Sequence, residues 1–172
     1  MRHLTTFLLV SASLAALLGA ASKPVIVDPL DETTGFFQLS PTALVEAEPG
    51  KAVLTKTEPA SDAFARWGHP HHNAIPFKAG ADRVEIAIAE LRGGAMLQVR
   101  VQFVDDAGGD LGHVPWMEAH DMPGTIALES LVAHAARHGK SDAAAFRLLF
   151  RHMGQPGGAI VLDEIRVVSS AN

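Results

Sequence analysis

Two segments in the middle of the chain alternate between apolar and polar positions. In residues 84–89, every second position is valine or isoleucine. In residues 97–103, every second position is leucine, valine or phenylalanine, and Gln98, Arg100 and Gln102 lie between them. Period-two alternation rich in β-branched residues is typical of strands with one buried face. The pattern predicts two strands, joined at a pair of glycines, that pack their apolar faces on a second layer.

Similar patterns predict further strands on both sides of this pair. Residues 25–27 form a short apolar run, and residues 43–47 and 52–57 fit a hairpin with a turn at 48–51. Residues 143–153 contain several alanines, which favour helix. In the same stretch, however, phenylalanine and leucine alternate with arginine, and this favours a strand.

The last apolar segment changes phase. Ile160 and Leu162 share one parity, whereas Ile165 and Val167 share the other, so the phase slips at Asp163. A β-bulge at this point would keep both apolar pairs on the buried face. We therefore predict one continuous strand with a bulge.

Residues 125–139 fit two structures. Leu128 and Leu131 belong to a helical face that Gly139 would end, whereas Ile126 and Leu128 fit a strand. We expect a strand first and a short helical turn before Gly139.

These segments predict an all-β protein with a single mature domain over residues 23–172. Strand parity also predicts which large side chains form the core. The predicted core residues are Phe103, Phe146, Phe150, Ile160 and Ile165.

The first 22 residues have the features of a signal peptide. Arg2 lies in a short basic start, residues 4–18 are largely apolar, and small residues precede Lys23. A transmembrane anchor is the alternative, although the apolar run is shorter than the roughly 20 residues that a spanning helix needs. We expect export to the periplasm or the extracellular space, without membrane insertion after cleavage.

Charge and cysteine content narrow the function classes. Removing residues 1–22 leaves 13 Lys+Arg, because Arg2 is lost, and 19 Asp+Glu, a formal charge of about −6. This acidic balance argues against nucleic-acid binding as the main function. The chain has no cysteine, so it forms no disulfides despite the expected export.

The order of the blocks resembles a known family. Residues 77–81, 97–105, 145–150 and 157–167 follow one another as in the jelly-roll β-sandwich of galactose-binding-like domains and family 4/9/22-type carbohydrate-binding modules. The resemblance covers roughly residues 53–168. It implies a jelly roll of two antiparallel sheets and an exported, non-catalytic module that binds a glycan. A structural or protein-interaction module of the cell envelope on the same fold is the alternative.

One candidate binding surface lies on the polar side of two predicted strands. If residues 95–104 and 144–152 are neighbours in one sheet, their polar side chains share a face. Forked arginine donors and amides suit sugar hydroxyls or uronate carboxylates. The alternative is an ordinary solvated face. The candidate residues are Gln98, Arg100, Gln102, Arg147 and Arg151.

The two tryptophans are candidate sugar platforms. An exposed indole can stack on the apolar face of a pyranose ring, and Trp67 and Trp116 are the only tryptophans of a chain that lacks tyrosine. The alternative is that each ring fills the core or a loop. We expect Trp116 to overhang the polar face.

The resemblance also implies a structural calcium ion. In related modules an acidic residue on the closing strand helps to hold calcium with oxygens from the N-terminal segment. Asp163 matches that position, and Asp28, Asp31 or Glu32 would supply partners. The alternative is a carboxylate that stabilises the bulge.

Two further sets carry chemistry without a recognisable motif. His69, His71 and His72 cluster in sequence, and His113 or His120 with Asp121 would complete a zinc or copper set, although surface histidines are the simpler interpretation. Glu118 and Asp121 would be an acid/base pair. The chain has no nucleophile elbow, no phosphate-binding glycine loop and no HExxH, so we do not expect an enzyme.

Overall fold

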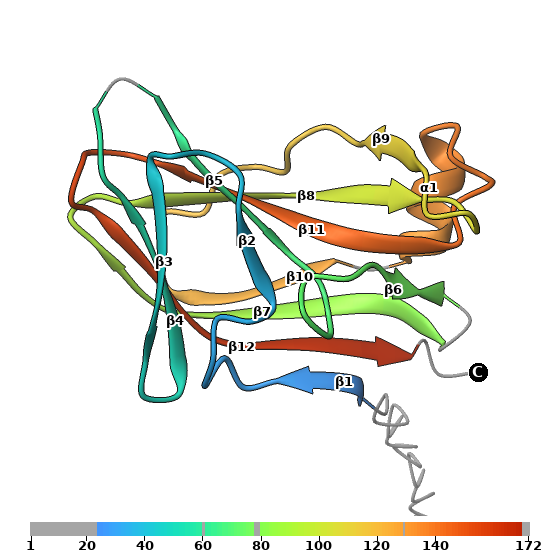
Figure 1. The fold of residues 1–172 in the computed structure, drawn as a ribbon, viewed down its shortest axis with the longest axis horizontal. Helices are drawn as coiled ribbons and strands as arrows, with labels where there is room; N and C mark the ends of the chain where they lie inside the picture. The colour runs from blue at the N-terminus through green and yellow to red at the C-terminus, as the bar shows by residue number, and fades with distance from the viewer. Residues whose placement is uncertain (1–23, 60, 78–79, 129, 170–172) are drawn as a thin grey trace, which may run out of the picture.

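The chain forms two antiparallel sheets packed face to face (Figure 1). The structure is a computed structural model and describes residues 24–59, 61–77, 80–128 and 130–169. The expected signal peptide lies outside these residues. The two layers confirm the predicted β-sandwich, and within the described ranges no helix has the length and apolarity to cross a membrane.

The first sheet is built around its longest two strands. Its order is β10-β7-β12-β4-β3, and β1 pairs with β12 beyond the end of β4. Its strands are β1 (Pro24–Asp28), β3 (Ala43–Glu48), β4 (Lys51–Lys56), β7 (Ala81–Arg92), β10 (Gly124–Leu128) and β12 (Ala159–Ser169).

The second sheet forms the other layer. Its order is β2-β5-β11-β8-β9, and the short β6 also pairs with β11. Its strands are β2 (Phe36–Gln38), β5 (Ala63–Trp67), β6 (Ile75–Pro76), β8 (Met96–Val104), β9 (Asp110–His113) and β11 (Ala145–Met153).

The two alternating segments become β7 and β8, but they belong to different sheets. The glycine connection therefore carries the chain from one layer to the other. Gly93 and Gly94 have φ angles of 62° and 69°, which side chains with a Cβ rarely adopt. Each of the two strands must turn its apolar side chains towards the core. Two strands in facing layers meet this requirement as well as two neighbours in one sheet do.

Most local predictions are confirmed. β3 and β4 form the expected hairpin, in which Glu48 pairs with Lys51 across the turn. The ambiguous segment is the strand β10 followed by the helix α1 (Leu131–Arg137), and Gly139 follows the helix with a φ of 68°. Residues 145–153 are strand despite their alanines, because one face packs into the core.

The predicted bulge is present in β12. Its pairing with β7 shifts between Leu162 and Glu164, so Asp163 is the extra residue and is exposed. Ile160 and Leu162 on one side of the bulge and Ile165 on the other are all fully buried. The bulge also separates the part of β12 that pairs with β4 from the part that pairs with β1.

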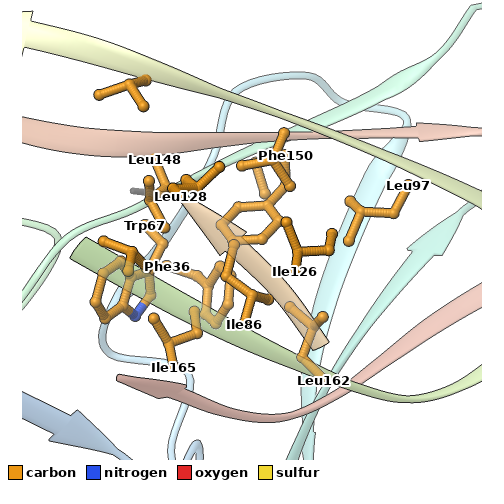
Figure 2. Close-up of a cluster of buried hydrophobic side chains, with 14 of the residues drawn as sticks. Phe36, Trp67, Ile86, Leu97, Ile126, Leu128, Leu148, Phe150, Leu162 and Ile165 are labelled. Atoms are coloured by element: carbon orange, nitrogen blue, oxygen red, sulfur yellow. The ribbon is translucent and has the colours of Figure 1, made fainter. Parts of the chain in front are cut away.

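The core lies between the layers and is rich in aromatic and branched side chains (Figure 2). The five predicted core residues are all fully buried. Trp67 is also fully buried, which corrects its prediction as a candidate sugar platform. Its indole nitrogen donates a 2.8 Å hydrogen bond to the Asp28 carboxylate at the end of β1. This bond ties the second sheet to the first.

Truncating a core phenylalanine tests this packing. Phe103→Ala or Phe146→Ala should lower the free energy of unfolding by about 3–5 kcal/mol, because each leaves a cavity between the sheets. Chemical denaturation measures the loss. Phe37→Ala is the matched control, since Phe37 is 46% exposed and its loss should cost far less. A cost below about 1 kcal/mol for both core variants would show that the strand phase is wrong.

One core position is a histidine. His152 is fully buried near the end of β11, and its Nε2 lies 2.8 Å from the carbonyl oxygen of Gly158. Burial lowers the pKa of His152, although the hydrogen bond to Gly158 opposes this shift. The folded protein therefore holds this imidazole neutral at pH values where an exposed histidine takes up a proton.

This lowered pKa predicts acid sensitivity. The unfolded chain protonates His152 below about pH 6.5 and the folded chain only at a lower pH, so stability is kept above about pH 6.5 and falls below it. Between pH 7.5 and 5.5 the free energy of unfolding of the wild type should fall by more than that of His152→Gln, by up to about 1.4 kcal/mol. Denaturation curves at both pH values measure this, with exposed His71→Gln as control. Equal losses in wild type and His152→Gln would assign the effect to another group.

Candidate functional site

The pairing of β8 with β11 brings the predicted polar residues together. In this register Arg147 lies opposite Gln102, and Arg151 lies opposite Gln98. Arg100 lies opposite Leu149, between these two pairs. Because the intervening residues of both strands are buried in the core, all these side chains emerge on the outer face of the second sheet. We call this surface the polar face.

The segment after β9 positions Trp116. Residues 114–120 run along the free side of β8 and continue its hydrogen bonding after β9 ends. The bonds run from the amide of Val114 to Val101 (3.1 Å), of Met117 to Val99 (3.0 Å) and of His120 to Leu97 (2.8 Å). Trp116 is thereby held beside Arg100, as the sequence predicted, and it is partly exposed.

The indole of Trp116 is covered by a cation. The guanidinium carbon of Arg100 lies 4.1 Å from the ring centroid, and that of Arg151 lies 5.8 Å away. Phe64 on β5 lies at 6.0 Å, tilted by 35°. Cation–π contact of this kind favours the stacked position of Arg100. Trp116 therefore does more to orient this arginine than to present a bare platform.

Arg151 is engaged within the protein. Its Nε donates to Asp62 at 2.7 Å, and its Nη1 donates to the Gln98 side-chain oxygen at 3.0 Å. Gln98 in turn donates to the carbonyl of Met117 at 3.1 Å. This network fixes the edge of the polar face that lies under Trp116.

Gln102 anchors the opposite edge. It donates a 2.7 Å hydrogen bond to Asp110 in β9, and it pairs with His113 across the strands. Asp110 also accepts from the amide of Gly112 at 2.6 Å. The carboxylate of Asp110 therefore already accepts two hydrogen bonds, and these hold the edge strand β9 against β8.

Three arginines on this side of the second sheet have no anionic partner: Arg100 and Arg147 of the polar face, and Arg66 on the neighbouring strand β5, opposite Leu149. Arg66, Arg100 and Arg147 each have a buried Nε that donates to no acceptor among the described residues, and they form no ion pair there. Burial lowers the pKa of Arg66, with the charge of Arg147 adding to the effect. Burial and the charge of Arg151 lower the pKa of Arg100. Guanidinium groups nevertheless stay charged in proteins, so the face is cationic.

The sequence analysis missed two contributors, both from β5. Arg66 pairs with Leu149 and so joins the polar face, and Phe64 pairs with Arg151. Phe37 on β2 lies next, with the Arg66 guanidinium 5.2 Å from its ring centroid. Alternation within residues 63–67 was the available signal, but it was masked because aromatic residues occupy both parities.

Of the candidate calcium residues, Asp28, Asp31 and Glu32 line one hollow, whereas Asp163 is not part of that lining. Asp28 lies opposite the buried Ile165, and its carboxylate accepts hydrogen bonds from Trp67 and from the amide of Leu30. Asp163 instead is exposed at the bulge. No group of three or more histidine, aspartate or glutamate side chains in the described ranges is placed to hold a metal ion. These residues do not fit the calcium site that the resemblance implies.

The other candidate sets are also dispersed. His69 and His71 line a shallow hollow with Asp28, Asp31 and Glu32, whereas His113 and His120 lie along β8. Glu118 and Asp121 are both exposed. A general acid of a glycosidase needs a shielded environment, which these two carboxylates lack.

Comparison with known proteins adds the fold class. No family model matches the sequence, and no curated protein does. A mutant of a carbohydrate binding module family 29 has a TM-score of 0.51 at 9% identity, over 84% of this chain and 92% of that chain. The CBM22-1–GH10 modules of Clostridium thermocellum endo-1,4-beta-D-xylanase 10B, complexed with xylohexaose, have a TM-score of 0.55 at 10% identity. This match covers 88% of this chain and 29% of that chain. The chain thus has the β-sandwich fold of carbohydrate-binding modules.

Fluorescence quenching tests the surroundings of Trp116. Relative to their effects on free tryptophan at equal ionic strength, iodide should quench the wild type more than caesium does, because the unpaired Arg100 attracts anions to this ring. Trp116→Phe should retain only the buried Trp67, with blue-shifted emission that resists both ions. Iodide-sensitive emission from Trp116→Phe, or equal quenching of the wild type by the two ions on this relative scale, would contradict this geometry.

Proposed function

We propose that this chain is an exported, non-catalytic glycan-binding module, and that the polar face is its binding surface. The observation that carries the proposal is the union of Arg100, Arg147 and Trp116 on one outer face of a sandwich with the fold of carbohydrate-binding modules. Support for export comes from the apolar segment before Lys23.

The face suits a saccharide chain for physical reasons. Guanidinium groups and side-chain amides offer several donors in fixed directions, and hydroxyl-rich ligands accept from such donors. Trp116 and Phe37 already hold Arg100 and Arg66 in stacked positions, so less side-chain entropy is lost at these two residues when a ligand binds. Phe64 and Phe37 add partly exposed aromatic surface beside the arginines.

The alternative is a structural or protein-interaction module. Its support would be an extended apolar patch, since such patches mark protein contacts. The large apolar side chains exposed in the described ranges are distributed over β1, the region of β2, β3, the loop before β10 and α1. The arginine-rich face is the more specific feature, and we therefore favour the glycan.

A glycan array on the purified mature chain tests the proposal, followed by calorimetry on the glycans that bind. Arg100→Ala and Trp116→Ala should each weaken binding by roughly 10- to 100-fold, or about 1.4–2.8 kcal/mol, because each removes part of one stacked pair. Thermal unfolding should confirm that both variants fold.

The matched control is Arg137→Ala on the exposed side of α1, which should bind as the wild type does. An array on which no glycan binds would overturn the proposed function. An equal loss of affinity in Arg137→Ala would show that the polar face is not the binding surface.

A further inference from the structure

The three unpartnered arginines surround one residue. Leu149 on the central strand β11 has Arg66 opposite it on β5 and Arg100 opposite it on β8. Arg147 precedes Leu149 by two positions and therefore emerges on the same face. Neighbouring strands lie about 4.8 Å apart, so the three backbone positions fall within roughly 10 Å of one another. We call Arg66, Arg100 and Arg147 the arginine triad.

The carboxylates nearest the triad are already engaged. Asp62 accepts from Arg151 and lies 3.9 Å from the Lys56 ammonium nitrogen. Asp110 accepts from Gln102 and the amide of Gly112, and it acts on Arg66 only through its charge. An acidic chain that offers 19 carboxylates thus leaves three clustered guanidinium groups without one.

The balance of charge on the polar face is opposite to that of the chain. Arg66, Arg100, Arg147 and Arg151 stand against Asp62 and Asp110, a formal +2, while the whole sequence carries −5. Like charges held together in partly buried positions repel one another. A bound anion would relieve this repulsion.

The aromatic side chains point to the same ligand chemistry. A neutral glycan is held mainly by stacking on bare rings. Here Arg100 covers the Trp116 ring and Arg66 lies over Phe37, so the rings serve to hold guanidinium groups in place. The N–H donors of these guanidinium groups are arranged as a fork. A carboxylate matches this fork, because it accepts two parallel hydrogen bonds from one arginine.

We propose that the ligand of this face is an acidic polysaccharide, and that the arginine triad receives the carboxylates of its uronate residues. This rests on the proposed function and specifies its substrate class. The polymer would cross β5, β11 and β8 over Leu149, with Trp116 and the Asp62–Arg151 pair along one side of its path.

The test compares polygalacturonate with its fully methyl-esterified form, which has the same backbone without charge. Affinity electrophoresis and calorimetry should show binding of the acid form, with at least a tenfold loss on esterification. Arg66→Lys and Arg147→Lys keep the charge and lose the fork, so each should weaken binding about tenfold. Arg137→Lys on α1 is the matched control and should change nothing.

Further arms separate the other outcomes. Equal binding of both forms, or preference for a neutral xylan or mannan, would overturn the uronate inference and leave the proposed function standing. Binding of no polysaccharide would overturn both. Tighter binding of a sulfated polysaccharide would overturn the choice of carboxylate. Equal binding of polyglutamate, with no effect of either lysine variant, would show unspecific attraction and overturn the triad as a site.

Discussion

Each strand of a two-layer sandwich can bury only one of its faces, and for β8 and β11 this constraint decides where the cations lie. Both strands fill the core with apolar side chains of one parity, so the arginines and glutamines of the other parity emerge together. A slip of one residue in either strand would bring guanidinium groups into the core and phenylalanines into solvent, and its cost fixes the register. The burial of the apolar side chains in the core thus determines where the arginines and glutamines lie on the outer face.

The features that could be predicted from the sequence are those whose signal lies within one short segment of the chain. Alternation within a strand is local, and it identified β8, β11 and the two halves of β12 around the Asp163 bulge. Pairing between strands distant in sequence is not local. The sequence therefore placed Arg100 and Arg147 on one face only on the condition that their strands are neighbours. It did not predict that β7 and β8 belong to separate sheets.

The misassigned tryptophan has a similar cause. Within Ala63–Trp67 one parity carries two alanines and Trp67, and the other carries Phe64 and Arg66. Hydrophobicity alone does not separate these sets, because each contains one aromatic ring. The neighbours decide: Leu148 and Phe36 flank Trp67 from the core, and Asp28 from the other sheet accepts its N–H. That choice also places Arg66 on the polar face.

The positions of the two ends of the domain determine how it can be attached to anything else. Pro24 in β1 pairs with Val168 in β12, so both ends leave the first sheet at the same place (Figure 1). The polar face belongs to the outside of the second sheet, on the far side of the core. A tether or fused domain at either end therefore leaves this face open, and a long polymer can lie across it without meeting the attachment.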